Sequence, residues 1–168
     1  MSPENPPTHR DLARRLAVHV AGTTARETHL DPGDLADLRR ISPDSPLPAA
    51  FWHVWARHLV DAGVATPERP WSLALRAMAV LAGLHQPTRP LGEALAHSKL
   101  SDMRFTRLLR AREDQVAHEV RSIAAWLKSH GESCDLSDIA MLLLRPDDEN
   151  LRHHIARSYY ANLDTKES

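Results

Sequence analysis

Apolar residues recur at helical spacing along nearly the whole of this chain. Within residues 9–21, for example, Leu12, Leu16 and Val20 lie four residues apart, which places them on one face of a helix. No segment alternates polar and apolar residues for long enough to predict a half-buried strand. The pattern therefore predicts an all-α protein, a helical bundle of about nine helices with short connections.

Capping and breaking residues set the predicted bounds of these helices. Asp31 is an expected N-cap before Pro32, and Ser101 is an expected N-cap of the helix that follows it. Gly63 and Gly131 stand where helices commonly end. The nine predicted helices lie within residues 9–21, 32–41, 48–63, 66–85, 91–98, 102–111, 114–131, 135–145 and 147–163.

The helices are expected to form a single all-helical domain over residues 9–163, either as one bundle or as two packed sub-bundles. A chain of 168 residues is long enough to bury most of its apolar side chains. Residues 1–8 and 164–168 are expected to be flexible termini, because they show no helical pattern.

Some apolar segments stand out as candidates for the core. Residues 72–85 are nearly unbroken in apolar content, so this helix is the predicted central element. Tyr159 shares a predicted helix face with apolar residues, and Trp52 and Trp55 share a helix with others. Core packing is therefore the preferred interpretation of these aromatic side chains, ahead of stacking on bases.

Composition fits a folded protein without a membrane segment. Hydrophobic residues make up 42% and charged residues 26% of the chain, and the net charge is −1. No apolar run approaches the roughly 18 residues that span a bilayer, and the polar N-terminus does not resemble a secretory signal. Cys134 is the single cysteine, which excludes an internal disulfide. We expect a cytoplasmic location and no membrane partner.

Charge is distributed unevenly in spite of the near-neutral total. Residues 94–112 contain five basic residues and one acid, whereas residues 132–149 contain six acids and one arginine. Any attraction for an anionic partner must therefore be local, because the molecule as a whole is not basic.

The main basic feature is an arginine stripe, formed by Arg104, Arg107 and Arg110. At 100° per residue these three occupy one arc of a helix, opposite an apolar face. Asp102 is the one acid nearby in the sequence, whereas a solubilising face usually mixes both signs. Arg112 would point back toward the apolar face, so either the helix ends before it or its side chain extends to solvent.

Other basic residues could extend this surface. Arg40 is expected on the exposed side of an earlier helix, with Arg39 at its flank, and Arg121 and Lys128 share one side of the helix after the stripe. If these residues converge in space, they would form a surface suited to a phosphate backbone without reading of bases.

Signatures of catalysis and of metal binding are absent from the sequence. The glycines are scattered singly, so no phosphate-binding loop is present, and no enzyme activity is expected. His118 and Glu119 begin like a zinc-protease motif, but Ser122 stands where the second histidine would be. Cys134 lies beside acids that raise a thiol pKa, so it is interpreted as a small, partly buried side chain. We expect no metal and no cofactor.

Two other function classes remain open from the residues alone. A helical protein-interaction module could use the arginine stripe to bind an acidic partner. A sequence-specific helix-turn-helix protein would need polar side chains that read bases, and Gln115 and Asn162 are the only candidates near the stripe.

Four segments together resemble the CasB family, the small subunit of the type I-E CRISPR Cascade complex. These segments are DLADLRRISP, PAAFWHVWARHL, LGEALAHSKLSDMRFTRLLRARED and LRHHIARSYY, in that order between residues 34 and 160. They cover roughly three quarters of the chain. The third segment is the most specific, since LGxALA followed by a serine-capped RFxRLLRA rarely arises by chance.

The resemblance implies an all-α, non-catalytic subunit that works in antiviral defence within a guide-RNA complex. Its implied partners are the backbone and large subunits, a second copy of itself, the guide RNA, and the target DNA including the displaced strand. Its implied role is to stabilise the opened target, the R-loop, through a basic surface. The residues that match the family's basic motif, and are expected to bind nucleic acid, are Arg40, Arg104, Arg107 and Arg110. The neighbouring Arg39, Lys99 and Arg121 are included with them as expected binding residues.

Overall fold

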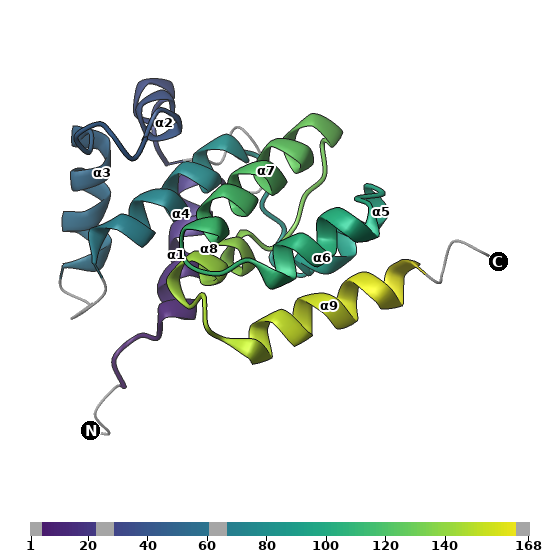
Figure 1. Cartoon of the computed structure of the whole chain (residues 1–168). Helices are drawn as coiled ribbons and strands as arrows, with labels where there is room; N and C mark the ends of the chain where they lie inside the picture. The colour runs from purple at the N-terminus through teal and green to yellow at the C-terminus, as the bar shows by residue number, and fades with distance from the viewer. Residues whose placement is uncertain (1–4, 23–28, 61–66, 164–168) are drawn as a thin grey trace.

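The computed structural model describes residues 5–22, 29–60 and 67–163, and within these ranges it contains nine α-helices and no strand (Figure 1). The all-α prediction is confirmed. The helices are α1 His9–Val20, α2 Pro32–Arg39, α3 Ala49–Val54, α4 Glu68–Val80, α5 Leu91–His97, α6 Asp102–Arg110, α7 Asp114–His130, α8 Leu136–Leu144 and α9 Glu149–Leu163. A π-helical turn, Trp55–Leu59, continues α3.

Local capping explains why several helices begin and end where they do. The Asp31 side chain accepts a hydrogen bond from the Asp34 amide, and Ser101 Oγ accepts one from the Arg104 amide at 3.3 Å. Gly131 ends α7 with a φ of +61°, a conformation that glycine adopts without strain. These three predictions are confirmed, whereas the predicted helix end at Gly63 lies outside the described residues.

The predicted termini are described only in part. Residues 5–8 precede α1 without regular structure. The rest of the two predicted flexible segments, 1–4 and 164–168, lies outside the described residues. Within the described ranges, no helix combines the length and the hydropathy needed to cross a bilayer.

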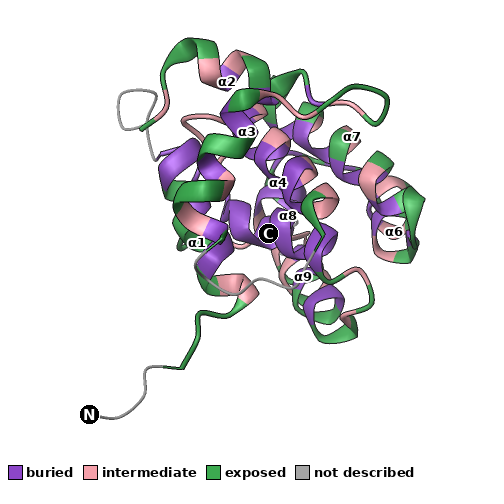
Figure 2. Ribbon diagram, turned by 90° about the vertical axis from the view of Figure 1, so that its left-hand side faces the viewer, coloured by how far each residue is buried: buried purple, intermediate pink, exposed green. Residues whose placement is uncertain are grey.

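Helix α8 is the most completely buried helix among the described residues, and it shares the core with α4, the predicted central element, which packs against α1, α2, α7 and α8. All nine residues of α8 are buried, and the helix packs against α1, α4 and α7 (Figure 2). Its one carboxylate can be buried because Asp138 accepts hydrogen bonds from Arg10 Nη1 at 2.7 Å and from the Leu91 amide at 3.1 Å. Helix α4, in contrast, keeps Arg76 on a half-exposed edge.

Helices α5 and α9 approach each other closely at Gly92. A Cβ atom at this position would lie 2.3 Å from the Ile155 carbonyl oxygen, so only glycine fits. The contact places Tyr159 against α6, where its ring stacks on Phe105 with 3.8 Å between centroids. The Tyr159 hydroxyl also donates to the Leu100 carbonyl at 2.5 Å. Tyr159 thus joins α9 to α6, and its predicted core position is confirmed.

The two tryptophans of the α3 segment lie less deep than the sequence suggests. Trp52 is 44% exposed, so its prediction as a core residue is wrong, while Trp55 is half-buried against the core. The reason is that Phe51 and Val54 fill the buried face of this short helix. The ring of Trp52 packs edge-on against Phe51 instead of entering the core.

Candidate nucleic-acid interface

The three members of the arginine stripe differ in how far their charges are already engaged. Arg104 is half-buried between α6 and α7. Its guanidinium lies 4.7 Å from the centroid of the Trp126 ring, and its Nη2 donates to Ser122 Oγ at 3.1 Å. Trp126 is held in turn by a 2.9 Å hydrogen bond from its Nε1 to Ser98 Oγ. Arg104 therefore fixes the packing of α6 on α7 and has little freedom to move toward a ligand.

Arg107 is paired with an acid that the sequence pattern did not connect to it. Its Nε lies 3.0 Å from Glu119 Oε1, and the Glu119 residue is only 6% exposed. The expectation that Asp102 is the one acid near the stripe is therefore wrong, because α7 brings Glu119 alongside Arg107. Asp102 itself accepts a 2.6 Å hydrogen bond from the Tyr160 hydroxyl.

Arg110 is the stripe residue with the most accessible charge. Its side chain is exposed and makes no hydrogen bond or ion pair with any described residue. Helix α6 ends at Arg110, which confirms the alternative in which the helix stops before Arg112. Arg112 then turns toward α9, where its Nη2 lies 2.9 Å from Glu149 Oε1.

A buried arginine that the sequence did not single out holds the end of α6 in place. Arg152 on α9 is 3% exposed. Its guanidinium donates to the backbone carbonyls of Leu109, Ala111 and Pro146, at 2.9 Å for Ala111 and 2.7 Å for Pro146. Burial is the main cause that lowers the pKa of Arg152. This side chain is structural, because its donors join carbonyls at the end of α6, which Arg112 Nη1 shares, to the Pro146 carbonyl before α9.

The remaining predicted binding residues occupy separate positions. Arg39 Nε donates to the Ala79 carbonyl at 2.9 Å, at the end of α4. Arg40 is exposed, and its Nη1 lies 3.3 Å from Asp37 Oδ1 on the same helix. Lys99 is exposed at the junction of α5 and α6, with a φ of +64°. Arg121 is exposed on α7.

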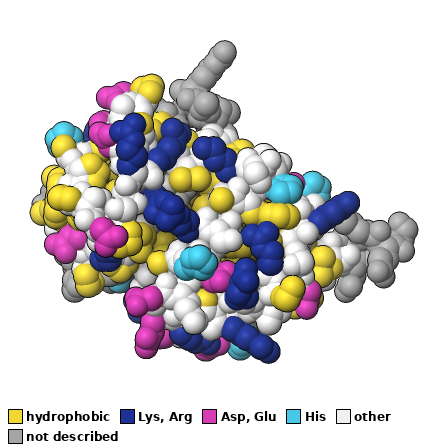
Figure 3. Space-filling view, turned by 45° about the horizontal axis from the view of Figure 1, so that its top comes forward, with side chains coloured by type: hydrophobic (Ala, Val, Ile, Leu, Met, Phe, Trp, Pro, Cys, Tyr) yellow, Lys and Arg dark blue, Asp and Glu magenta, His cyan; other side chains and the backbone are white. Residues whose placement is uncertain are grey.

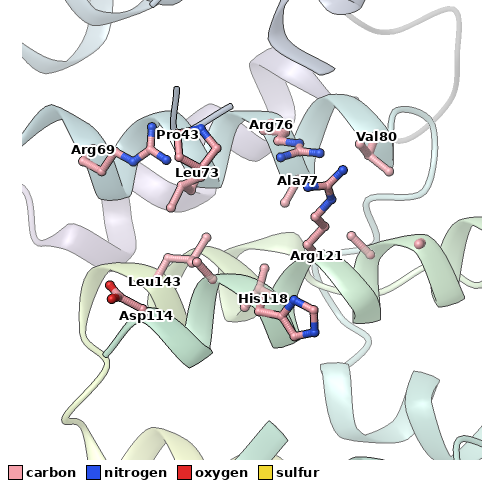
Figure 4. Close-up of a pocket in the computed structure, with 14 residues that line it drawn as sticks. Pro43, Arg69, Leu73, Arg76, Ala77, Val80, Asp114, His118, Arg121 and Leu143 are labelled. Atoms are coloured by element: carbon pink, nitrogen blue, oxygen red, sulfur yellow. The ribbon is translucent and has the colours of Figure 1, made fainter. Parts of the chain in front are cut away.

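A groove between α4 and α7 brings Arg121 together with two arginines that the sequence pattern had not selected, Arg69 and Arg76 (Figure 4). Burial, followed by the nearby charges of Arg121 and Arg69, lowers the pKa of Arg76. We call this hollow the α4–α7 groove. The spacing of seven between Arg69 and Arg76, which places both on one helix face, is the signal that could have identified them.

The stripe and the α4–α7 groove are neighbours on the surface. A second hollow, beside Arg107 and Glu119, shares Asp114 and His118 of α7 with the groove. Lys and Arg side chains gather over the middle of one face of the molecule, whereas most of the acidic side chains visible there lie toward its edge (Figure 3). The structure therefore brings Arg107 and Arg121 to adjoining sites, while Arg40 and Lys99 line neither hollow.

Neither the single cysteine nor the metal-ligand residue types form a reactive site among the described residues. Cys134 is completely buried, deeper than predicted, and its backbone pairs with the segment around His85. Burial raises the pKa of its thiol, with Asp138 as a further cause. Across the described ranges, no three His, Cys, Asp or Glu side chains are grouped as metal ligands.

Comparison with solved structures finds the same fold in CRISPR-associated proteins. CasB from Thermus thermophilus is 26% identical, with 91% of this chain and 96% of that chain covered and a TM-score of 0.65. A second structure from Thermus thermophilus, of a Cse2-family protein, is 25% identical, with the same coverage of both chains and a TM-score of 0.64. A chain in the crystal structure of E. coli Cascade bound to a PAM-containing double-stranded DNA target is 19% identical, with 92% of this chain and 95% of that chain covered and a TM-score of 0.63.

The family comparison agrees with these structural similarities. No curated protein sequence matches the chain. The sequence model described as CRISPR-associated protein Cse2 matches residues 34–160, the same range that carries the four resembling segments. Because this match covers well over half of the chain, the chain belongs to the Cse2 family of CRISPR-associated proteins, whose member from Thermus thermophilus is called CasB.

Proposed function

We propose that this chain is a non-catalytic small subunit of a type I-E Cascade complex, in which its basic surface stabilises the R-loop between guide RNA and target DNA. Membership of the Cse2 family supports the assignment to a CRISPR complex. The main support for the R-loop role is that two exposed arginines, Arg110 and Arg121, make no ion pair with any described acid. Both lie beside hollows on the basic face.

The energetics of target opening explain why such a surface would matter. Exchange of a DNA duplex for a guide–target hybrid is nearly balanced in free energy, so a few contacts to the phosphate backbone can favour the open state. Arginine suits this task because its planar guanidinium pairs with phosphate oxygens through two hydrogen bonds. The guide would read the sequence, and this subunit would hold the strands in place.

The partners in this proposal are the backbone and large subunits of the complex, a second copy of this chain, the guide RNA and the two target strands. The paired and buried acids of the fold leave the basic face positive while the net charge stays near neutral, at −1. A near-neutral subunit can present one face to nucleic acid and its other faces to proteins.

Co-purification tests the assignment to the complex. A tagged copy of the full chain is expressed with the guide RNA and the other Cascade subunits from the same source. We expect the tag to recover the guide RNA and the backbone and large subunits in a fixed ratio. Recovery of the tagged chain alone would overturn the proposal.

A further inference from the structure

The α4–α7 groove has an apolar floor with arginines on its rim. It has a volume of about 360 Å³. Small aliphatic side chains line its floor, and three guanidinium groups stand at its edges. The floor is made by Leu73, Ala77, Val80, Ala117, Ala124 and Leu143. The rim arginines are Arg69, Arg76 and Arg121.

The rim arginines lack acidic partners. None of the three forms an ion pair with any described carboxylate, although Asp114 lies at one end of the groove. Arg69 uses one donor, since its Nη1 lies 3.3 Å from the Ser42 carbonyl oxygen. Arg76 and Arg121 point toward one another from opposite walls (Figure 4). Two like charges held this close repel each other, and an anion bound between them would replace the repulsion with attraction.

The lining of the groove restricts what that anion can be. A flat ring with an attached phosphate is compatible with it, because the ring can lie on the aliphatic floor while the phosphate reaches the rim. The arginine rim and the apolar floor together suit a nucleotide, and the proposed function already assigns nucleic acid to this face.

We propose that the α4–α7 groove holds one unstacked nucleotide of a single DNA strand, with the base on the apolar floor and the neighbouring phosphates on Arg76 and Arg121. The inference rests on the proposed function and adds a base-binding site to a surface otherwise expected to contact the backbone alone. No sequence reading is implied, because aliphatic side chains offer no hydrogen bonds to base edges.

The affinities of the protein for two single strands, one with bases and one without, distinguish contact with the base from contact with the phosphates. The full-length protein is titrated at low salt against a labelled single-stranded oligothymidylate and against a strand of equal length that carries no bases. We expect the protein to bind the oligothymidylate about fivefold more tightly, because the face of a base that lies on the aliphatic floor is removed from water. Both strands should bind more weakly to the double variant Arg76→Gln with Arg121→Gln.

One substitution fills the floor without changing the charge. Ala117 is half-exposed on α7, and Ala117→Phe would occupy the space assigned to the base. Ala161→Phe, at an exposed position on α9, is the matched control. We expect Ala117→Phe to lower the affinity for oligothymidylate to that for the strand without bases, and Ala161→Phe to have no effect. Thermal unfolding of both variants checks that they fold. If either variant does not fold, the affinities of the unchanged protein for the two strands still test the base site.

Several results would overturn the base site. One is equal affinity of the unchanged protein for the two strands, and another is no detectable binding of either strand. A third is tighter binding of a leucine-containing acidic peptide that Ala117→Phe abolishes, which would assign the groove to a protein segment. Equal affinity for the two strands, combined with weaker binding of both by an Arg110→Glu variant, would reject the base site and leave the proposed function in place.

Discussion

Replacement of Arg152 by methionine should destabilise the protein by about 3 kcal/mol, because it removes a buried cation that three carbonyls use as their donor. The guanidinium reaches the carbonyls of Leu109, Ala111 and Pro146 from a site that is 3% exposed. Each hydrogen bond from a charged donor contributes roughly 1.5–3 kcal/mol, and an unpaired buried carbonyl costs a further 1–3 kcal/mol. The sum is reduced because methionine carries no charge to desolvate, and because the Leu109 and Ala111 carbonyls keep a second donor in Arg112 Nη1.

Arg112 offers a matched control for this prediction. Its Nη1 also donates to the Leu109 and Ala111 carbonyls, at 3.2 and 3.0 Å, and its Nη2 pairs with Glu149. Because the side chains of Arg112 and Glu149 are both about half-exposed, whereas Arg152 is buried, Arg112→Met should cost no more than about 1 kcal/mol. Unfolding in urea, followed by tryptophan fluorescence, measures both variants. For a chain of this size, a loss of 3 kcal/mol should lower the Tm by about 6–12 °C. Equal stability of the two variants would refute the claim that Arg152 fixes the end of α6.

Three further predictions concern other contacts. Gly92→Ala should destabilise the fold by about 2 kcal/mol or more, measured in the same urea assay, because its Cβ would meet backbone of α9; unchanged stability would contradict the close approach. Arg107→Ala should lower the free energy of unfolding by about 1–2 kcal/mol, because it leaves Glu119 buried and unpaired. Adding Glu119→Gln should restore most of this loss in a double-mutant cycle. Additive effects of the two substitutions would contradict the ion pair. Burial, with the neighbouring charge of His58 as the next cause, lowers the pKa of His19 from 6.5 to about 4. The unfolded chain therefore binds a proton that the folded protein resists, and stability should fall by up to about 3 kcal/mol as the pH drops from 6.5 to 4, with a smaller fall for His19→Asn.

The features that the sequence predicts well are those that depend on neighbouring residues. The caps at Asp31 and Ser101 and the end of α7 at Gly131 need only a few adjacent positions, and each was identifiable from residue type alone. The all-α fold class was predictable for the same reason, because helical periodicity also depends on residues close together in the sequence. These local signals yield the helices and their order, but not which helix is most completely buried.

The parts that the sequence misses depend on contacts between helices. Glu119 is far from Arg107 in the helical pattern, and only the packing of α6 on α7 brings the two together. The burial of Arg152 follows from carbonyls in another segment, and Trp52 is excluded from the core because Phe51 already fills it. The groove of Arg69, Arg76 and Arg121 likewise exists only when α4 meets α7. Sequence therefore located one part of the basic face, and tertiary packing decided which charges on that face are accessible.

Retention of target DNA by the assembled complex tests the central claim most directly. The complex is prepared with the double variant Arg110→Glu and Arg121→Glu, and with Arg15→Glu as a control, since α1 and α6 lie on opposite sides of the molecule (Figure 2). Dissociation of the opened target is then measured at several salt concentrations. We predict faster dissociation for the double variant and no change for Arg15→Glu. In a plot of the logarithm of the binding constant against the logarithm of the salt concentration, the slope for the double variant should be shallower by about 1.4. This value is about 0.7 for each of the two single-strand phosphates that the variant no longer neutralises. Dissociation rates and salt dependence equal to those of the unchanged complex would contradict the account.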